Sequence, residues 1–397
     1  MTSDAYRFLG TCIRGTALGV SDWEGVFDEA AAETVLPSLS GLLRGCELPA
    51  EVASFLSAVT AANSERNALI SRELRAAVEL LNSIGIVPVL LKGVAYQAIG
   101  LYPEAGSRYL QDIDLLLPVE DLAAGAAVMR AHGFVAGVPD AFGEFRHHLR
   151  PLHRANRVWV ELHARLGPAK CAKMLPAREV IAGSREAELD GVRVRIPCPE
   201  HLMVHLVMHS QMQHPYNQRV WPQMRAMFDL VLLGRKYGAL QTTDFENAPS
   251  ESRMATRRAD ARRQGRSPGP TNGQTAMCHE ALDWDRVAER FRRNGAYDLL
   301  ALHLMQVRES TGVEVPLRLE VGWVARIRWA RRQFLRRWPG MRYVDPIYMY
   351  STVFGHRVAM ARSLLGSRKG LRYLAGQVLV PDNYARIWTD LVEGRGR

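Results

Sequence analysis

Lysine is scarce in this sequence of 397 residues, although the chain carries a formal net charge of +10. The basic side chains are mostly arginine, and the lysines are Lys92, Lys170, Lys173, Lys236 and Lys369. The positive charge is consistent with anionic partners such as nucleotides, nucleic acid or an acidic membrane surface. Because lysine offers a compact point charge for a phosphate, the isolated Lys92 is a candidate ligand for one.

Long apolar runs and paired cysteine motifs are also missing. No stretch approaches the roughly 20 apolar residues that a transmembrane helix needs, and the first ten residues lack a signal-peptide pattern. The five cysteines are scattered without metal-ligand spacing, and an odd number favours free thiols in a reducing compartment. We therefore expect a cytoplasmic protein with no transmembrane segment.

The length of the chain predicts two or three lobes rather than one core. We predict an α+β fold, with a small mixed β-sheet core at residues 84–197. An N-terminal helical lobe at 1–83 and a C-terminal helical lobe at 198–397 would flank it. Residues at about 243–280 are rich in Arg, Ser, Pro and Gly and poor in large apolar side chains, which predicts a disordered insertion.

Local patterns place several elements. Ser21 and Glu24 have the spacing of a capping box, and apolar residues recur at helical spacing from about Pro49 to Leu81. A strand at Pro88–Leu91 should lead through a turn at Lys92-Gly93 into a helix that ends near Leu101. Two hairpins follow: one joins Phe145–Leu149 to Arg157–His163, and one turns at Asp190-Gly191.

Two aspartates, Asp112 and Asp114, begin an apolar run that reads as a strand. Side chains two apart on a strand share a face, so both carboxylates should leave the same face. On the strand Arg157–His163, Glu161 and His163 likewise share a face. Clustered carboxylates repel unless a cation lies between them, and their oxygens suit Mg²⁺. The alternative is a strand end that carries two solvated aspartates.

These motifs together resemble a known family. They are LLKG at residues 90–93, Arg108, DID at 112–114, VELH at 160–163, the helix from Pro199 that carries His209, and ALDWDRV at 281–287. In this order they are similar to the uncharacterised nucleotidyltransferase family of the polymerase-β-like superfamily. The resemblance covers roughly Asn82 to Leu240 well and the C-terminal third loosely.

The resemblance implies a metal-dependent transfer of a nucleoside monophosphate from a nucleoside triphosphate to an acceptor. Two Mg²⁺ ions, or Mn²⁺ in their place, would neutralise the phosphates. The implied roles are metal bridging by Asp112 and Asp114, a third carboxylate from Glu161, a triphosphate contact from Lys92, and close backbone approach at Gly93. Arg108 would bind phosphate or brace the aspartates, His163 would support the ligands, and His209 would face the substrate cleft.

Several alternatives stay open at this point. The wider superfamily has a Gly-Ser turn before its aspartates, where this chain has Lys92-Gly93. The chain could be a non-catalytic nucleotide- or peptide-binding accessory protein of the same fold, or a protein directed to nucleic acid. The acceptor could be a small molecule or a peptide, and the resemblance suggests peptide natural-product biosynthesis as one setting.

Two further segments carry competing interpretations. His201, His205 and His209 recur every four residues, which fits a polar seam facing the cleft better than a zinc site, because no HExxH pattern is present. The segment Val321–Trp338 mixes arginine and tryptophan. It could meet a membrane or nucleic acid, but we expect a structural helix whose tryptophans turn to the protein and whose arginines snorkel.

Overall fold

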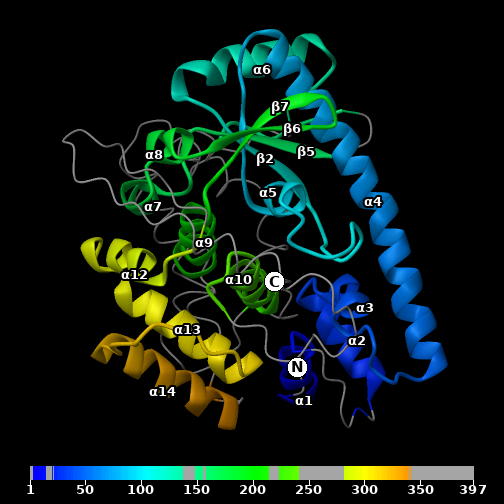
Figure 1. The fold of residues 1–397 in the computed structure, drawn as a ribbon, viewed down its shortest axis with the longest axis vertical. Coiled ribbons are helices and arrows are strands. Elements are labelled where there is room, and N and C mark those ends of the chain that lie inside the picture. Colours follow the sequence, from blue (N-terminus) through cyan, green and yellow to red (C-terminus); the bar gives the residue numbers. More distant parts are fainter. Residues whose placement is uncertain are drawn as a thin grey trace, which may run out of the picture.

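The computed structural model describes residues 3–14, 20, 22–136, 148–154, 158–213, 223–240, 281–338 and 341. The predicted insertion at about 243–280 lies outside this part of the chain. Figure 1 shows a sheet in the upper half of the molecule and a group of helices below it.

A seven-stranded mixed sheet forms the core, in the order β3-β4-β5-β2-β1-β7-β6. β2 pairs in parallel with β5 and antiparallel with β1, and β1 is parallel to β7. This sheet with its surrounding helices confirms the predicted α+β class. The strands are β1 (Val89–Leu90), β2 (Asp112–Leu116), β3 (Val135–Ala136), β4 (Leu152–His153), β5 (Trp159–His163), β6 (Arg185–Leu189) and β7 (Val192–Ile196).

Helices cover the sheet and build the lower half of the molecule (Figure 1). The long helix α4 (Ala50–Ser83) runs along one side, from the N-terminal helices up to the sheet. The others include α1 (Ser3–Cys12), α2 (Trp23–Ala32), α3 (Leu39–Leu42), α5 (Lys92–Ala98), α6 (Leu122–Ala131), α7 (Ala169–Met174) and α8 (Ala177–Ala182). Further along the chain come α9 (Pro199–Met208), α10 (Met224–Lys236), α12 (Trp284–Arg293), α13 (Tyr297–Thr311) and α14 (Trp323–Arg337). The division into three lobes stays a prediction.

The two faces of the sheet differ in what covers them. On one face, Gly125 of α6 packs so closely that an added Cβ would lie 3.1 Å from Leu117 and 3.0 Å from Leu81 of α4. This face also carries the buried Ile113 and Val160, which are cross-strand neighbours. The opposite face carries the carboxylates of β2 and β5, and Asp112 and Glu161 line a cavity there together with residues of α5 and α9. The alternation of the strands therefore separates an apolar face from a polar one.

Several local predictions are confirmed. Apolar periodicity placed the long helix correctly, as α4. The hairpin of β6 and β7 turns at Asp190 and Gly191, whose φ angles are 49° and 83°. Both residues are left-handed, as a two-residue type I′ hairpin requires, and glycine adopts that region without steric cost.

Other local predictions need correction. The N-cap of α2 is Asp22, whose side chain accepts a hydrogen bond from the Gly25 amide, and not Ser21. Helix α5 begins at Lys92 itself and ends at Ala98, earlier than predicted. In the first predicted hairpin, the strand that pairs with β5 is β4, which lies later in the sequence than the predicted strand Phe145–Leu149. Of that predicted strand, residues 145–147 lie outside the described residues, and His148 forms an isolated bridge with His163.

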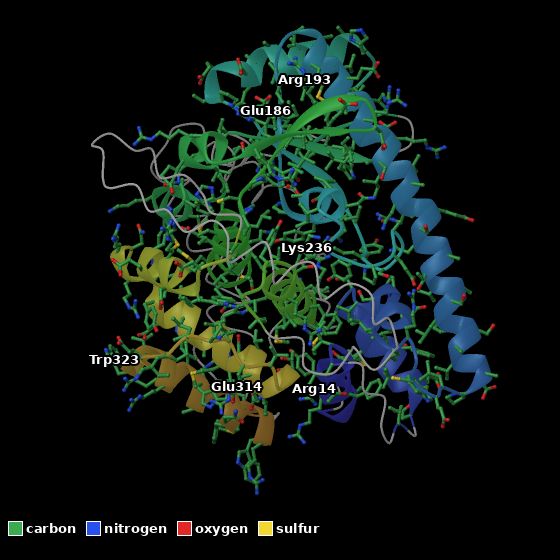
Figure 2. All side chains as sticks on the ribbon, in the orientation of Figure 1. Arg14, Glu186, Arg193, Lys236, Glu314 and Trp323 are labelled. Atoms are coloured by element: carbon green, nitrogen blue, oxygen red, sulfur yellow. The ribbon has the colours of Figure 1, made fainter. Side chains whose placement is uncertain are left out.

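Helix α14 is oriented differently from the expectation. Trp323 is 73% exposed and Trp338 is 58% exposed, so the prediction that the tryptophans turn to the protein is wrong at these two positions. Figure 2 shows Trp323 at the outer edge of the molecule. Arg332 is buried, and Arg336 forms an ion pair with Glu309 of α13. Because these arginines lie toward α13, the aromatic side of the helix is left facing outward.

The cysteines depart from the expectation at one position. Cys12, Cys46 and Cys171 are free thiols, but Cys198 is disulfide-bonded, which sequence spacing did not reveal. Within the described residues, no helix combines the length and the apolar character that crossing a membrane demands.

Candidate active site

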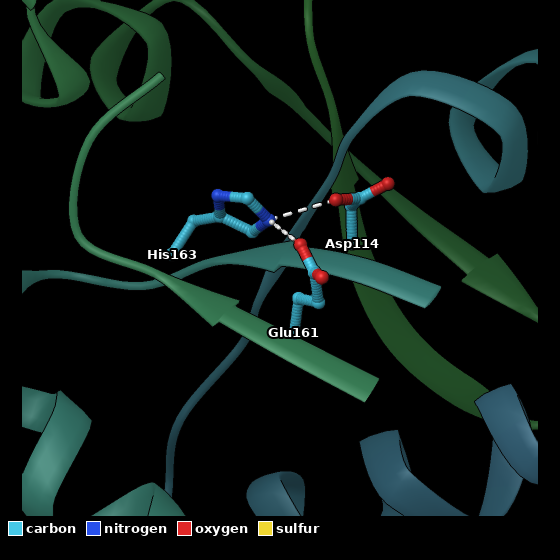
Figure 3. Close-up of side chains that lie close together, drawn as sticks. All are labelled: Asp114, Glu161 and His163. Atoms are coloured by element: carbon cyan, nitrogen blue, oxygen red, sulfur yellow. Dashed lines mark hydrogen bonds and ion pairs between the residues drawn. The ribbon is translucent and has the colours of Figure 1, made fainter. Parts of the chain in front are cut away.

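The parallel register of β2 and β5 brings the predicted carboxylates together. Asp114 lies directly opposite Glu161, and Leu116 lies opposite His163. His163 Nε2 lies 2.7 Å from Asp114 Oδ1 and 3.3 Å from Glu161 Oε2 (Figure 3). Among the described residues, these three form a group whose ligand atoms all lie within 4.8 Å of one another. Asp112 does not belong to this group, although it shares their face of the sheet.

Lys92 approaches the same group from the start of α5. Its Nζ donates to Asp114 Oδ1 at 2.6 Å, so in this structure the ammonium meets a carboxylate. Lys92 has a φ angle of 46°, in the left-handed region. A non-glycine residue there costs about 1–2 kcal/mol, and the buried ion pair offsets that strain. The predicted triphosphate contact of Lys92 stays a prediction.

Charge pairing decides the ionisation of the buried group. Burial opposes ionisation of Asp114, but the Lys92 ammonium and a hydrogen bond from His163 hold the pKa of this carboxyl well below its usual range. Burial likewise disfavours charge on His163, and its hydrogen bonds to Asp114 and Glu161 nevertheless raise the imidazole pKa. The pKa of Glu161 is lowered because the bond from His163 outweighs burial. The structure therefore favours a charged network around Asp114.

Asp112 behaves in the opposite way. Burial, followed by repulsion from Asp114, raises its pKa from 3.8 to about 6. The folded state thus binds a proton more tightly than the unfolded state does. This carboxyl does not weaken the metal-free fold below about pH 4, where both states are protonated. Its destabilising effect develops as the pH rises to about 6.

This asymmetry predicts the pH dependence of one variant. In metal-free protein, Asp112→Asn should raise the melting temperature relative to wild type at pH 7.5 and change it little at pH 4, because asparagine cannot ionise. Thermal melts of both proteins across this range measure the difference. Equal differences at both pH values would contradict the raised pKa.

A cavity of about 320 Å³ opens next to this group. Asp112 and Glu161 line it, whereas Asp114 is only 1% exposed. The remaining lining residues come from α5, the loop before β2, the segment before β4, α9 with the π-helical turn that follows it, and α10 with its N-cap. They are Lys92, Gly93, Tyr96, Arg108, Tyr109, Gln111, His148, His205, Leu206, His209, Gln223, Arg225, Ala226 and Asp229.

Arg108 lies in the cavity wall but is held by Asp229 of α10. Its Nε and Nη2 donate to the two carboxylate oxygens at 3.0 and 2.8 Å, and Tyr102 Oη donates to the same carboxylate at 2.8 Å. An added Cβ at Gly93 would lie 2.7 Å from Arg108 Nη1, so the missing side chain makes room for the guanidinium. Arg108 therefore braces Asp229, and not the aspartates of β2. The phosphate-binding roles of Arg108 and Gly93 stay predictions.

The loop that carries Arg108 is pinned to α4. Asn63 Nδ2 donates to the carbonyls of Gly106 and Arg108, and Asn67 Nδ2 donates to those of Ala105 and Arg108. These amides satisfy carbonyl groups that would otherwise be buried without a partner. The ion pair of Arg108 therefore links α10 to the sheet and to α4 at one point.

Removing one partner of this link should be costly. We expect Asp229→Asn to lower the free energy of unfolding by about 3 kcal/mol, because the Arg108 guanidinium would stay buried without a counter-charge. Urea denaturation measures this, with Tyr102→Phe as a milder control at about 1 kcal/mol. If Asp229→Asn lowered the free energy of unfolding by less than Tyr102→Phe does, the stabilising ion pair between Arg108 and Asp229 would be contradicted.

The three histidines of the predicted seam separate in the structure. His205 and His209 line the cavity, and burial, followed by the charge of Lys92, lowers the pKa of His205 to about 3. His201 lies 3.4 Å from Glu179 and does not line the cavity, so the seam prediction is wrong at this position. A π-helical turn at His209–Gln213 follows α9 directly, and such turns are frequent at functional sites.

The cavity residues that sequence reasoning missed include two that carry charge or can carry it, His148 and Arg225. His148 Nε2 lies 3.7 Å from Glu161 Oε2, and its ring lies 5.1 Å from that of His163. Arg225 is on the first turn of α10, close enough that its charge lowers the pKa of Asp112. His148 lay within a predicted strand without a motif of its own. Arg225 is one of many arginines, so its identity carried no signal.

Comparison with known proteins identifies the family. The family model described as "Uncharacterised nucleotidyltransferase" matches residues 20–255, more than half of the chain. The chain belongs to this family. The match begins within the N-terminal helical region, earlier than the resemblance indicated, and ALDWDRV at 281–287 lies beyond it. The chain is therefore a nucleotidyltransferase enzyme, and its family implies a nucleoside triphosphate as substrate.

Solved structures show more distant similarity. One is an antigenic nucleotidyltransferase-like protein from Paracoccidioides brasiliensis, with 16% identity and a TM-score of 0.29, covering 43% of this chain and 75% of that chain. Another is the Megavirus polyadenylate synthase, with 13% identity and a TM-score of 0.32, covering 56% of this chain and 40% of that chain. A search of curated proteins finds no match.

The donor set of this nucleotidyltransferase fits a divalent cation. Asp114 and His163 are buried, Glu161 is partly buried, and their ligand atoms converge. Two carboxylates and an imidazole are common ligands for divalent metals in proteins. The residues present could therefore hold the ion that nucleotidyltransferases generally use.

Proposed function

We propose that this enzyme transfers a nucleoside monophosphate from a nucleoside triphosphate to a hydroxyl or amine of an acceptor. The acceptor oxygen or nitrogen forms a bond to the α-phosphorus. The bond from that phosphorus to the oxygen that bridges the α- and β-phosphates breaks. Pyrophosphate leaves, and the acceptor proton passes to a base or to water. The acceptor is a small molecule or a peptide, and peptide natural-product biosynthesis is one setting for it.

The observation that carries this proposal is the convergence of Asp114, Glu161 and His163 beside the cavity. Phosphoryl chemistry needs positioning and charge neutralisation more than it needs covalent help. Bound divalent ions, Mg²⁺ or Mn²⁺, would supply that neutralisation. A non-catalytic accessory protein that binds a metal-bound nucleotide would present the same carboxylates, so formation of product separates the two.

The protein residues have distinct proposed roles. Asp112, Asp114 and Glu161 hold the metal ions. Lys92, which donates to Asp114 in this structure, would contact the triphosphate. His209 and Arg225 face the substrate from the helical side of the cavity. Arg108 acts by fixing Asp229 and α10, and as a lining residue of the cavity it also faces the phosphates.

The test uses labelled triphosphates. Full-length protein is incubated with Mg²⁺ or Mn²⁺, each of the four common nucleoside triphosphates and a lysate of small molecules and peptides. The proposal predicts that label from the α-phosphate enters a product together with pyrophosphate release, and that Glu161→Gln abolishes both. Transfer of a γ-phosphate label would show phosphoryl transfer instead. Triphosphate binding without any product would favour the accessory-protein alternative.

A further inference from the structure

Two imidazoles accompany the carboxylates of β2 and β5, and their nitrogens change which cation the group would select. His163 Nε2 lies 2.7 Å from Asp114 Oδ1 and 3.3 Å from Glu161 Oε2. A cation with bonds of about 2.1 Å keeps neighbouring ligand atoms about 3.0–3.4 Å apart. The distance from His163 to Glu161 already fits such a coordination shell, and the distance from His163 to Asp114 fits after a small lengthening.

His148 supplies an independent observation. Its Nδ1 lies 2.7 Å from the carbonyl oxygen of Leu149. A carbonyl only accepts hydrogen bonds, so Nδ1 carries the hydrogen and, in the neutral ring, Nε2 presents a lone pair. That Nε2 lies 3.7 Å from Glu161 Oε2. A histidine whose one nitrogen donates to a backbone carbonyl while the other faces a carboxylate has the arrangement typical of a metal ligand.

We infer that Asp114, Glu161 and His163, with His148 as a fourth donor, bind a first-row transition-metal ion such as Mn²⁺ through mixed oxygen and nitrogen ligands. The inference deepens the proposed function and rests on it, because it names the ion class of the same site. Imidazole nitrogen is a favourable ligand for transition ions, whereas Mg²⁺ prefers oxygen and keeps its waters. Asp112, outside the group, remains for an oxygen-bound Mg²⁺ that arrives with the triphosphate.

The competing explanation is a positioning role for His163. In that case Nε2 keeps, with metal bound, the hydrogen that it donates to Asp114 and Glu161 in the metal-free structure, and the imidazole only orients the carboxylates. The two explanations differ in a measurable way. A ligand nitrogen couples magnetically to a bound paramagnetic ion and selects between ions, and a positioning residue does neither.

Pulsed EPR on the full-length, Mn²⁺-loaded wild-type protein without nucleotide tests this directly. Protein grown with ¹⁴N- or ¹⁵N-histidine should show directly coordinated imidazole nitrogen, with a coupling pattern that changes between the isotopes. Absence of histidine coupling at a fully occupied site would overturn the inference. This measurement needs no variant, so it does not depend on whether a substituted protein folds.

Variants then identify the ligands. His163→Gln should lower Mn²⁺ affinity at least about 10-fold while changing Mg²⁺ affinity less than about 2-fold, as measured by calorimetric titration. His148→Gln should give a smaller loss with the same selectivity. The matched control is His153→Gln on β4, because this histidine packs on Trp159 and does not line the cavity. Equal losses for Mn²⁺ and Mg²⁺ in His163→Gln would support the positioning role instead.

The outcome is separable from that of the proposed function. Nucleotidylated product without histidine coupling would refute the nitrogen-ligated ion and leave the function standing. Histidine coupling without product from any of the four triphosphates would refute the function and leave the metal site standing.

Discussion

Asp114→Asn should abolish nucleotidyl transfer and also destabilise the metal-free protein. Activity should fall at least about 10³-fold, because removing a metal ligand forfeits several kcal/mol of transition-state stabilisation. The free energy of unfolding should fall by about 3 kcal/mol, because Lys92 and His163 would lose their shared buried counter-charge. Single-turnover assays with α-labelled triphosphate and urea denaturation without metal measure the two effects.

The sign of the stability change is the informative part. From the sequence alone, a strained cluster of carboxylates predicts that Asp114→Asn leaves metal-free stability equal or slightly higher. In the structure, the destabilising carboxylate is Asp112, whose pKa is raised. The pKa of Asp114 is lowered, so its charge is stabilised by its partners. Asp112→Asn is therefore the matched control, and it should stabilise metal-free protein at pH 7.5. If Asp114→Asn also stabilised it, the ion pair with Lys92 would be contradicted.

Lys92→Met should separate metal binding from nucleotide binding. The Lys92 ammonium competes with a metal ion for the Asp114 carboxylate. Without it, Mn²⁺ or Mg²⁺ alone should bind more tightly. The affinity for metal-bound triphosphate should instead fall at least about 10-fold, equivalent to about 1.4 kcal/mol, because a phosphate contact is lost. Calorimetric titrations with metal alone and with metal plus a non-hydrolysable triphosphate measure both affinities.

The scarcity of lysine provides a clean control for this experiment. Lys236→Met removes an exposed lysine at the end of α10, whose Nζ lies 3.5 Å from the Gly100 carbonyl. It should change neither affinity. If Lys92→Met weakened metal and nucleotide binding equally, the ammonium would have a structural role and no contact with the triphosphate.

Local features of the site were predictable because they depend on neighbours in sequence. The pair Asp112 and Asp114 was assigned to one strand face, since alternation is a property of any strand. Glu161 and His163 were assigned in the same way. The helix α4 and the turn at Asp190 followed from periodicity and turn chemistry. None of these inferences required knowledge of which strands are adjacent.

The partners of the charged residues could not be predicted in this way. Lys92 was assigned to a triphosphate and Arg108 to phosphate or to the aspartates, yet they meet Asp114 and Asp229. His148 received no role, because its approach to Glu161 depends on an isolated bridge to β5. Each of these contacts joins segments whose distance in space depends on the packing of the whole sheet and its helices.

The sequence by itself determined β1, β2, β5, the β6–β7 hairpin, the long helix and the residue types that could bind a metal and a phosphate. Tertiary structure decided which of those residues meet. The parallel register of β2 and β5 places Asp114 beside Glu161, and a shift by one residue would turn one of them to the apolar face. The same holds for α14, where ion pairing with α13 turned the aromatic side outward. Local patterns fix which side chains share a face, but the partner of a face depends on how the whole chain packs.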